Sequence, residues 1–310
     1  MTMKVKPLLL VFLLLASSFS YAQMVNTSRK EALEIQKRIL LVALPNGGNK
    51  KAKDMFKSLV GKYWTFNKKI EYVAASKVKG LMKKHKNKYA VLKYSSFSQT
   101  AINKTRNPAY DSRNPVLHSQ YKKSRYIANT IRIIMISLNG RKAHVKANLS
   151  SNYSLERNTI YGLMQMQYTL EYLVADPKNK SINTFYRKQI KKNAPELKNK
   201  TLLIDRELLA KKMTESKIKK YYPYPYKVVD APTIDKALKT RSDAYAFIHI
   251  ANLDVGKGAT NIHFISSAKD GKIYLYVAPK VGFSGLNGIK FRQYHAIGKK
   301  QLKKYTKRLR

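Results

Sequence analysis

The stretch KYYPYPYKV, residues Lys220–Val228, decides the fold, because KYWTFNKKI, residues Lys62–Ile70, repeats its lysine, its aromatic positions and its apolar end. Two further pairs of stretches match in the same order along the chain. They are ALEIQKRILLV (Ala32–Val42) with APELKNKTLLI (Ala194–Ile204), and YAVLKY (Tyr89–Tyr94) with YAFIHI (Tyr245–Ile250). Three collinear matches at nearly constant separation indicate an internal duplication, so we expect two copies of one domain.

The tyrosines of KYYPYPYKV also raise the possibility of a sugar-stacking platform or a polyproline II ligand. The duplication favours a structural role, because aromatic residues occupy three aligned positions in both copies. The aligned pairs are Tyr63 with Tyr221, Trp64 with Tyr222, and Phe66 with Tyr224. We expect these rings to pack the end of the first helix onto the sheet. Tyr226 aligns with a lysine, so the duplication does not indicate the role of its ring.

The element order predicts the fold class, which is α/β in the mixed α+β sense. Each copy alternates strand and helix until its third strand, and this alternation predicts a parallel three-stranded centre with right-handed crossovers. A hairpin follows, marked by Asn139-Gly140 in copy one and Asp270-Gly271 in copy two. With a closing helix, each copy is a β-α-β-α-β-β-β-α domain, a mixed sheet of about five strands with helices packed on it.

The domain boundaries follow from the duplication. Residues 1–22 are a signal peptide, 23–175 are copy one with a basic loop insertion at 98–128, 176–193 are a polar linker with one short helix, and 194–310 are copy two.

The amino terminus has the layout of a secretory signal peptide. Lys4 and Lys6 precede an apolar run, and small residues at Ser20 and Ala22 favour cleavage before Gln23. The apolar run is shorter than the roughly 20 residues that span a bilayer. The chain has no cysteine. We therefore expect a periplasmic or secreted protein that is not a lipoprotein and has no disulfides or zinc-thiolate sites.

The charge is the outlier of the composition. The chain has 62 Lys plus Arg against 17 Asp plus Glu, a formal net charge of +45. Such a field attracts polyanions. The partners expected outside the cytoplasm are lipopolysaccharide, acidic polysaccharide and extracellular nucleic acid. The alternative is a lysine-rich solvated surface without a specific partner.

The insertion in copy one is the candidate anion-binding site. Its cations and tyrosines are interleaved, and such a set contacts phosphates or sulfates and stacks on bases or sugar rings. The candidate residues are Lys104, Arg106, Arg113, Lys122, Lys123, Arg125, Tyr110 and Tyr121. The alternative is a solvated loop without a ligand.

Three carboxylates form the candidate catalytic site. Asp205, Asp230 and Asp254 fall at or beyond the carboxyl ends of the predicted parallel strands of copy two, where open α/β sheets bind ligands. Converging there, they would hold a divalent cation or supply acid and base groups. Each also has a structural reading, because Asp205 can cap a helix, Asp230 precedes a turn and Asp254 begins a loop.

The remaining motifs predict no cofactor and no metal. His249 and His263 lie on strands expected to be neighbours, but basic residues stand near the corresponding positions of copy one, as on a solvated sheet face. The PNGGNK stretch, residues 45–50, lacks both nucleotide-binding glycine patterns and is expected to be a turn.

The KNKTLLI opening of copy two, its YYPY segment and the Ala-Gln at the end of the signal peptide resemble exported proteins of Bacteroidetes-type Gram-negative bacteria. These motifs are structural, so the resemblance implies tandem small α/β domains and export but no activity. In element order alone, each copy is also distantly similar to the amino-terminal domain of TolB.

Together these patterns favour an exported, strongly basic, non-enzymatic envelope or secreted protein that binds an anionic polymer or an envelope partner. One alternative is a metal-dependent hydrolase that uses the three carboxylates of copy two. Another is a component of a larger envelope assembly.

Overall fold

The computed structural model describes residues 27–44, 49–102, 126–254, 259–278, 281–283, 289–291 and 296–310, and only the backbone at 97–102, 126–130, 253–254, 259–260, 281–283 and 289–291. The expected signal peptide lies outside these ranges. Within them, no helix has both the length and the apolar character of a bilayer-crossing segment.

Copy one is a five-stranded mixed sheet in the order β2-β1-β3-β4-β5. The first three strands are parallel, and β3, β4 and β5 pair antiparallel. The elements are α2 (Arg29–Lys37), β1 (Ile39–Leu44), α3 (Lys50–Tyr63), β2 (Ile70–Ala74), α4 (Ala75–Lys84), β3 (Tyr89–Ile102), β4 (Tyr126–Ser137), β5 (Val145–Leu149) and α6 (Leu155–Ala175).

Copy two repeats this sheet in the order β7-β6-β8-β9-β10. Its elements are β6 (Thr201–Asp205), a 3-10 turn (Arg206–Leu208), α9 (Glu215–Tyr221), β7 (Tyr226–Val229), α10 (Ala231–Lys239), β8 (Tyr245–Asp254), β9 (Ala259–Ser267), β10 (Ile273–Val277), β11 (Val281–Phe283), β12 (Ile289–Phe291) and α11 (Lys299–Leu309). Two mixed five-stranded sheets with helices packed on them confirm the predicted fold class.

Local chemistry explains where several elements begin and turn. Ser28 and Glu31 form a reciprocal capping box at the start of α2, and Asp230 accepts a hydrogen bond from the Thr233 amide at the start of α10. Gly140 and Gly271 both have φ of +73°, a left-handed conformation that glycine adopts without a steric penalty. The two predicted hairpin turns are confirmed at these glycines.

The strands of copy one place alternate residues on two faces of the sheet. Along β1, Leu40 and Val42 face the core beneath α3 and α6, whereas Leu41 and Ala43 pack with α4 on the opposite face.

The first helix of copy two is shorter than its apolar pattern predicts. Only Glu215–Tyr221 is α-helical, because the chain before it pairs with a distant segment, where the Ala210 amide donates to the Ile297 carbonyl.

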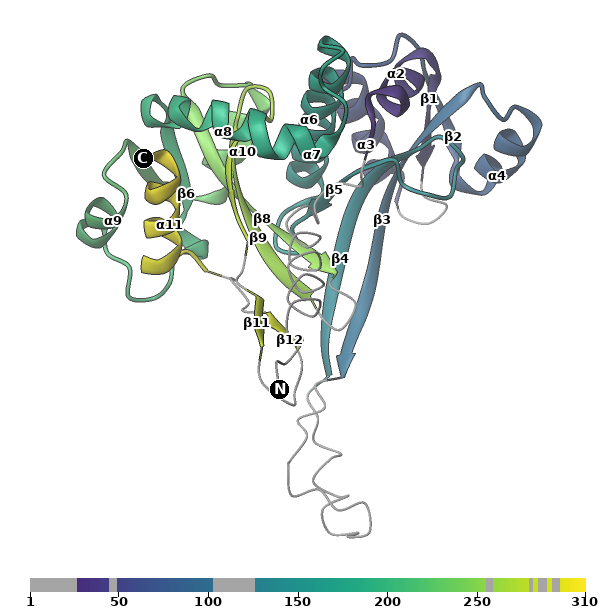
Figure 1. The fold of residues 1–310 in the computed structure, drawn as a ribbon. Helices are drawn as coiled ribbons and strands as arrows, with labels where there is room; N and C mark the ends of the chain where they lie inside the picture. The colour runs from purple at the N-terminus through teal and green to yellow at the C-terminus, as the bar shows by residue number, and fades with distance from the viewer. Residues whose placement is uncertain are drawn as a thin grey trace, which may run out of the picture.

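Helix α6 joins the two copies. It packs against α3 and β5 of copy one and against α10 of copy two (Figure 1). Buried side chains lie around most of its circumference, as expected for a helix covered on several sides. Leu203 and Phe247 of the second sheet belong to the same hydrophobic core as Leu40 of the first. The closing helix of copy one is therefore a central element of the whole molecule.

The segment expected as a linker is an integral part of copy two. Residues 182–199 form a continuous helical segment made of α7 (Ile182–Thr184), a π-helical turn (Phe185–Gln189), α8 (Ile190–Asn193) and a 3-10 stretch (Ala194–Asn199). Its apolar side chains Ile182, Phe185 and Ile190 are buried against β8, β9 and β10. Arg187, Lys188, Lys191 and Lys192 lie on its solvent side, whereas Asn193 is buried and donates to the Ile273 carbonyl of β10.

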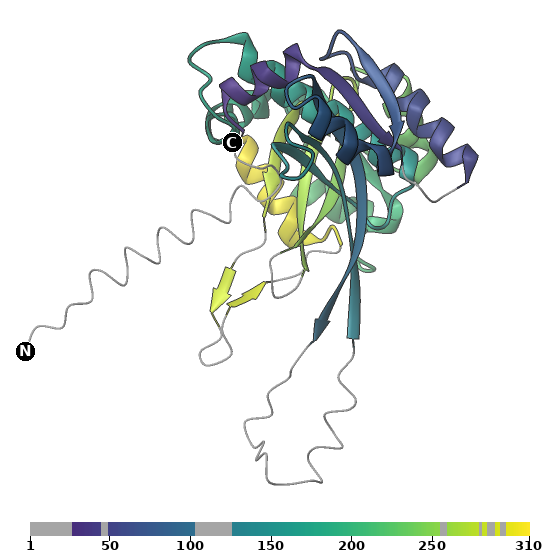
Figure 2. The same cartoon turned by 90° about the vertical axis from the view of Figure 1, so that its right-hand side faces the viewer.

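The insertion of copy one extends from a long two-stranded ribbon. Strands β3 and β4 pair from Val91 and Ser137 out to Ile102 and Tyr126, and the ribbon projects from the sheet (Figure 2). Residues 98–102 and 126–128, expected in the loop, are therefore strand. The eight candidate anion-binding residues, from Lys104 to Arg125, lie outside the described residues.

Candidate functional site

The three candidate carboxylates of copy two do not form one site. Asp205 is buried, accepts a hydrogen bond from the Glu207 amide and lies 3.4 Å from a guanidinium nitrogen of Arg157 on α6. Asp230 is exposed and caps α10. The pairing of β6 with β8 ends at Leu203 and Phe247, and two residues further in this register Asp205 would be level with His249, so Asp254 lies about 16 Å further along β8. Among the described residues, no group of three acidic or histidine side chains could hold a metal ion.

The two histidines lie on opposite faces of the second sheet, because His263 pairs with Ile250 and not with its neighbour His249. His249 stacks on Tyr161 of α6 with ring centroids 3.6 Å apart, and burial, followed by the charge of Arg157, lowers its pKa to about 3. His263 hydrogen-bonds to Tyr305 of α11. Both are core side chains, because copy two buries the sheet faces that the sequence pattern suggested were solvated.

The aromatic residues of the duplicated stretch pack as expected. Tyr63, Trp64, Phe66 and Tyr222 are buried, so they belong to the cores of their copies. Tyr226, whose role the sequence did not indicate, donates a hydrogen bond from its hydroxyl to the Glu215 carbonyl at the start of α9. These contacts give the stretch a structural role in both copies.

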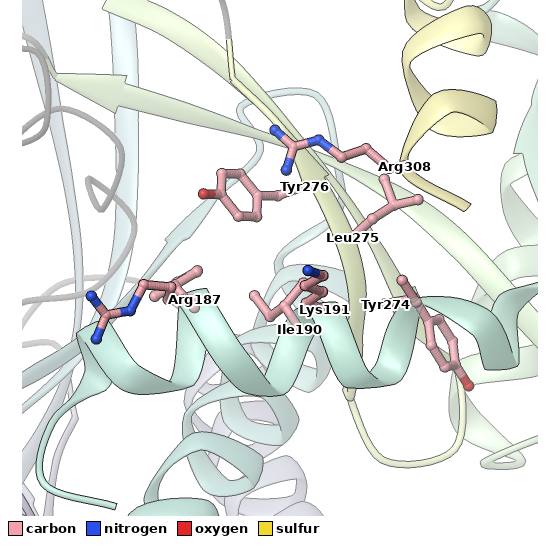
Figure 3. Close-up of a pocket in the computed structure, with 9 residues that line it drawn as sticks. Arg187, Ile190, Lys191, Tyr274, Leu275, Tyr276 and Arg308 are labelled. Atoms are coloured by element: carbon pink, nitrogen blue, oxygen red, sulfur yellow. The ribbon is translucent and has the colours of Figure 1, made fainter. Parts of the chain in front are cut away.

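The structure instead places a pocket of about 250 Å³ between the helical segment 182–199, strand β10 and helix α11 (Figure 3). We call it the basic-aromatic pocket. It is lined by Tyr186, Arg187, Ile190, Lys191, Ala194, Tyr274, Leu275, Tyr276 and Arg308. The lining holds three cations and three tyrosines and includes no acidic residue.

Two irregular backbone features meet at this pocket. Tyr186 and Arg187 belong to the π-helical turn, a rare geometry that is frequent at functional sites. Across from it, the pairing of β10 with β9 shifts register between Ile273 and Leu275, so Tyr274 is the extra residue of a β-bulge. Bulges re-aim side chains and are common beside active sites. The π-helical turn and the bulge therefore both lie at the border of this cavity.

The cations of the pocket are exposed, and they have no carboxylate partner within the described part of the chain. The nearby Lys272 does have a carboxylate partner, because its Nζ lies 3.0 Å from the Oε2 of Glu196. The guanidinium of Arg308 lies 5.7 Å from the ring centroid of Tyr276, a cation–π contact that holds it at the pocket. Arg187 and Lys191 come from the helical segment on the other side, and the Arg187 side chain points away from Tyr276 and Arg308 (Figure 3). The positive charge of the pocket is thus uncompensated by its own side chains.

The tyrosines do not offset this charge. Burial raises the pKa of Tyr186 well above its usual value, with smaller contributions from Tyr161 and Tyr276, and burial likewise raises the pKa of Tyr274. Both phenols therefore remain neutral at physiological pH. Tyr276 is half-buried, and one of its faces stacks on Phe264 with ring centroids 6.1 Å apart. The pocket offers cationic and neutral hydroxyl or aromatic groups to a ligand.

The described strands of copy one do not repeat the tyrosine or the bulge that border this pocket. Tyr276 pairs with Phe264, and at the corresponding pair of copy one Lys146 stands opposite Met135. The pairing of β4 with β5 also runs without a register shift. Because the bulge and the tyrosine occur only in copy two, they are not required by the fold that both copies share.

Sequence reasoning missed this pocket because it assigned residues 176–193 to a linker. A signal was present, since Ile182, Phe185 and Ile190 repeat at a spacing that one face of a helix can bury. The π-helical turn and the bulge have no comparable sequence signature.

No protein family, curated protein or solved structure matches this chain.

Proposed function

We propose that this protein is an exported, non-enzymatic binding protein that holds an anionic polymer, with the basic-aromatic pocket as its recognition point. The observation that carries the proposal is the composition of the pocket, where three cations and three tyrosines meet without an acidic lining residue. Cations contact phosphate, sulfate or carboxylate groups, and aromatic rings pack on sugar rings or bases.

The surface around the pocket supports contact with more than one unit of a polymer. Further exposed lysines lie on the two helices that line the pocket, with Lys188 and Lys192 on the helical segment and Lys307 on α11. A polymer with one unit in the pocket would therefore meet further cations on either side. The basic insertion of copy one, residues 98–128, is a second proposed contact for such a chain.

Export is part of the same proposal. The basic, apolar and small-residue segments of residues 1–22 support secretion with cleavage before Gln23. In the periplasm or outside the cell, the available anionic polymers are lipopolysaccharide, acidic polysaccharide and extracellular nucleic acid. The net charge of +45 supports attraction to each of them.

The proposal is tested by binding of the purified protein, without residues 1–22, to lipopolysaccharide, polygalacturonate and single-stranded DNA at several salt concentrations. We expect binding that weakens steeply with salt, because each neutralised anionic group releases counterions. The variant Arg187→Gln/Lys191→Gln/Arg308→Gln is expected to bind the preferred polymer at least about tenfold more weakly than the unmodified protein.

The matched control removes the same charge elsewhere. Lys77, Lys79 and Lys83 are exposed on α4 of copy one, so their replacement by glutamine lowers the net charge equally. A loss of affinity confined to the pocket variant supports the proposal. Equal losses in both variants, or binding that does not depend on salt, contradict it.

A further inference from the structure

We infer that the group recognised in the basic-aromatic pocket is a phosphate monoester carried on a single sugar ring. This inference rests on the proposed function and names its ligand class. It is drawn from the charge, the donor geometry and the size of the pocket.

The first step is charge. Arg187, Lys191 and Arg308 line one cavity, no acidic residue lines it, and two of its three tyrosines are held neutral by burial. A carboxylate or a sulfate ester carries a single negative charge. A phosphate monoester carries about −1.5 to −2 at pH 7 and presents three strong acceptor oxygens. Three cations are therefore balanced better by a phosphate monoester than by a uronic acid or a sulfated sugar.

The second step is donor geometry. Two of the three cations are arginines, and each guanidinium donates two parallel hydrogen bonds to a phosphate or a carboxylate. They come from different elements, Arg187 from the π-helical turn and Arg308 from α11 (Figure 3). Lys191 lines the cavity from the helical segment and Arg308 lines it from α11, so an anion with three oxygens can accept hydrogen bonds from both sides. The contact with the Tyr276 ring holds the Arg308 guanidinium near the cavity before any ligand binds, which reduces the entropy lost on binding.

The third step is size. A volume of about 250 Å³ is below the roughly 300–1,000 Å³ of pockets that enclose drug-sized ligands. It suits one ring with its phosphate and excludes a long segment of polymer. The apolar part of the lining, which includes Ile190 and Leu275, provides a surface against which a sugar ring can pack. The polymer would therefore be bound at a phosphorylated end or side branch.

The inference is tested by calorimetric titration of the protein without residues 1–22 with glucose 1-phosphate, glucuronic acid, inorganic phosphate and glucose. At pH 7.5 we expect glucose 1-phosphate to bind at least about tenfold more tightly than each of the other three. Its affinity should fall between pH 7 and pH 5, because the phosphate takes up its second proton with a pKa of about 6.

Two variants locate the site. Arg308→Lys keeps the charge but loses the paired donors, so we expect at least about a fivefold loss of affinity for glucose 1-phosphate. Lys198→Gln removes an exposed charge from the helical segment 182–199 outside the pocket, and we expect little change. Circular dichroism of both variants checks that each remains folded.

The outcomes separate this inference from the proposed function. If glucuronic acid binds as tightly as glucose 1-phosphate, the pocket does not select a phosphate and the inference is wrong. If inorganic phosphate binds as tightly, the pocket does not recognise the sugar ring and the inference is likewise wrong. If no sugar phosphate binds while a polymer still binds in a manner that depends on the pocket, the inference fails and the proposed function stands. If the pocket variant loses no affinity for any polymer, the proposed function itself fails.

Discussion

Replacing Arg157 by methionine is expected to lower the free energy of unfolding by about 3–5 kcal/mol, the usual cost of removing one partner of a buried ion pair. Arg157 extends from α6 into copy two and is only 3% exposed. Its guanidinium bonds to Asp205, to Asp235 and to the Ala231 carbonyl, and it lies 4.6 Å from the ring centroid of Tyr153. No other described ion pair joins the two copies with both side chains so deeply buried.

The magnitude follows from the group that is left behind. Methionine fills most of the space of the arginine stem, so the cavity is small. The carboxylate of Asp205, with its side chain 5% exposed, loses its counter-charge, whereas Asp235 is 29% exposed and is still reached by water. The cost therefore arises mainly at Asp205. A loss of this size is a large part of the 5–15 kcal/mol that stabilises an ordinary domain.

The assay is equilibrium unfolding in urea, followed by circular dichroism and by the fluorescence of Trp64 in copy one. The double variant Arg157→Met/Asp205→Asn removes both charges, so we expect it to lose less stability than the sum of the two single variants. Glu156→Gln breaks the exposed pair with Lys239 and should cost about 0.2–1 kcal/mol. A loss below about 1 kcal/mol for Arg157→Met, or additive losses in the double variant, would refute the reasoning.

Two further predictions concern the core. Burial, followed by the charge of Arg157, lowers the pKa of His249 to about 3 in the folded protein, whereas in the unfolded chain it is about 6.5. As pH falls from 6.5 to 3, the unfolded chain therefore binds a proton that the folded protein does not, and the folded protein loses stability. His249→Phe should therefore reduce the loss of stability between pH 6.5 and pH 3, measured as urea midpoints against pH; identical pH profiles would contradict this. Gly271→Ala should destabilise more than Gly140→Ala in thermal unfolding, although both have φ of +73°, because the new methyl group would lie 2.8 Å from the backbone of α6 at Gly271 but 3.3 Å from a flexible methionine side chain at Gly140. Equal losses would indicate that only the backbone conformation matters.

Much of the fold could be predicted because its signals are local. The duplication, the alternation of strands and helices and the two glycine turns are each carried by short stretches whose periodicity or backbone conformation the residues themselves specify. The first helix of copy two, which is shorter than its apolar pattern predicts, shows where such signals end. A tertiary pairing between Ala210 and Ile297 takes over part of it, which an apolar pattern does not reveal.

The candidate catalytic site also shows that local signals do not specify where side chains lie in the tertiary structure. Asp205, Asp230 and Asp254 were placed at one sheet edge from strand order, and strand order alone cannot tell how far each strand runs. Strand β8 continues well beyond the end of β6, so Asp254 is carried away from the edge. Asp205 is neutralised by an arginine from the other copy, which no pattern within copy two could have indicated.

The sequence by itself determined the element order, the duplication, the hairpin turns and the excess of positive charge, because each depends on neighbouring residues or on composition. Only the tertiary structure decided which face α6 covers, which acid Arg157 meets and where a pocket forms. Arg187, Tyr276 and Arg308 are far apart in the chain and meet only because a helical segment, an edge strand and the last helix pack together. Contacts of that kind arise from long-range packing, to which local periodicity does not extend.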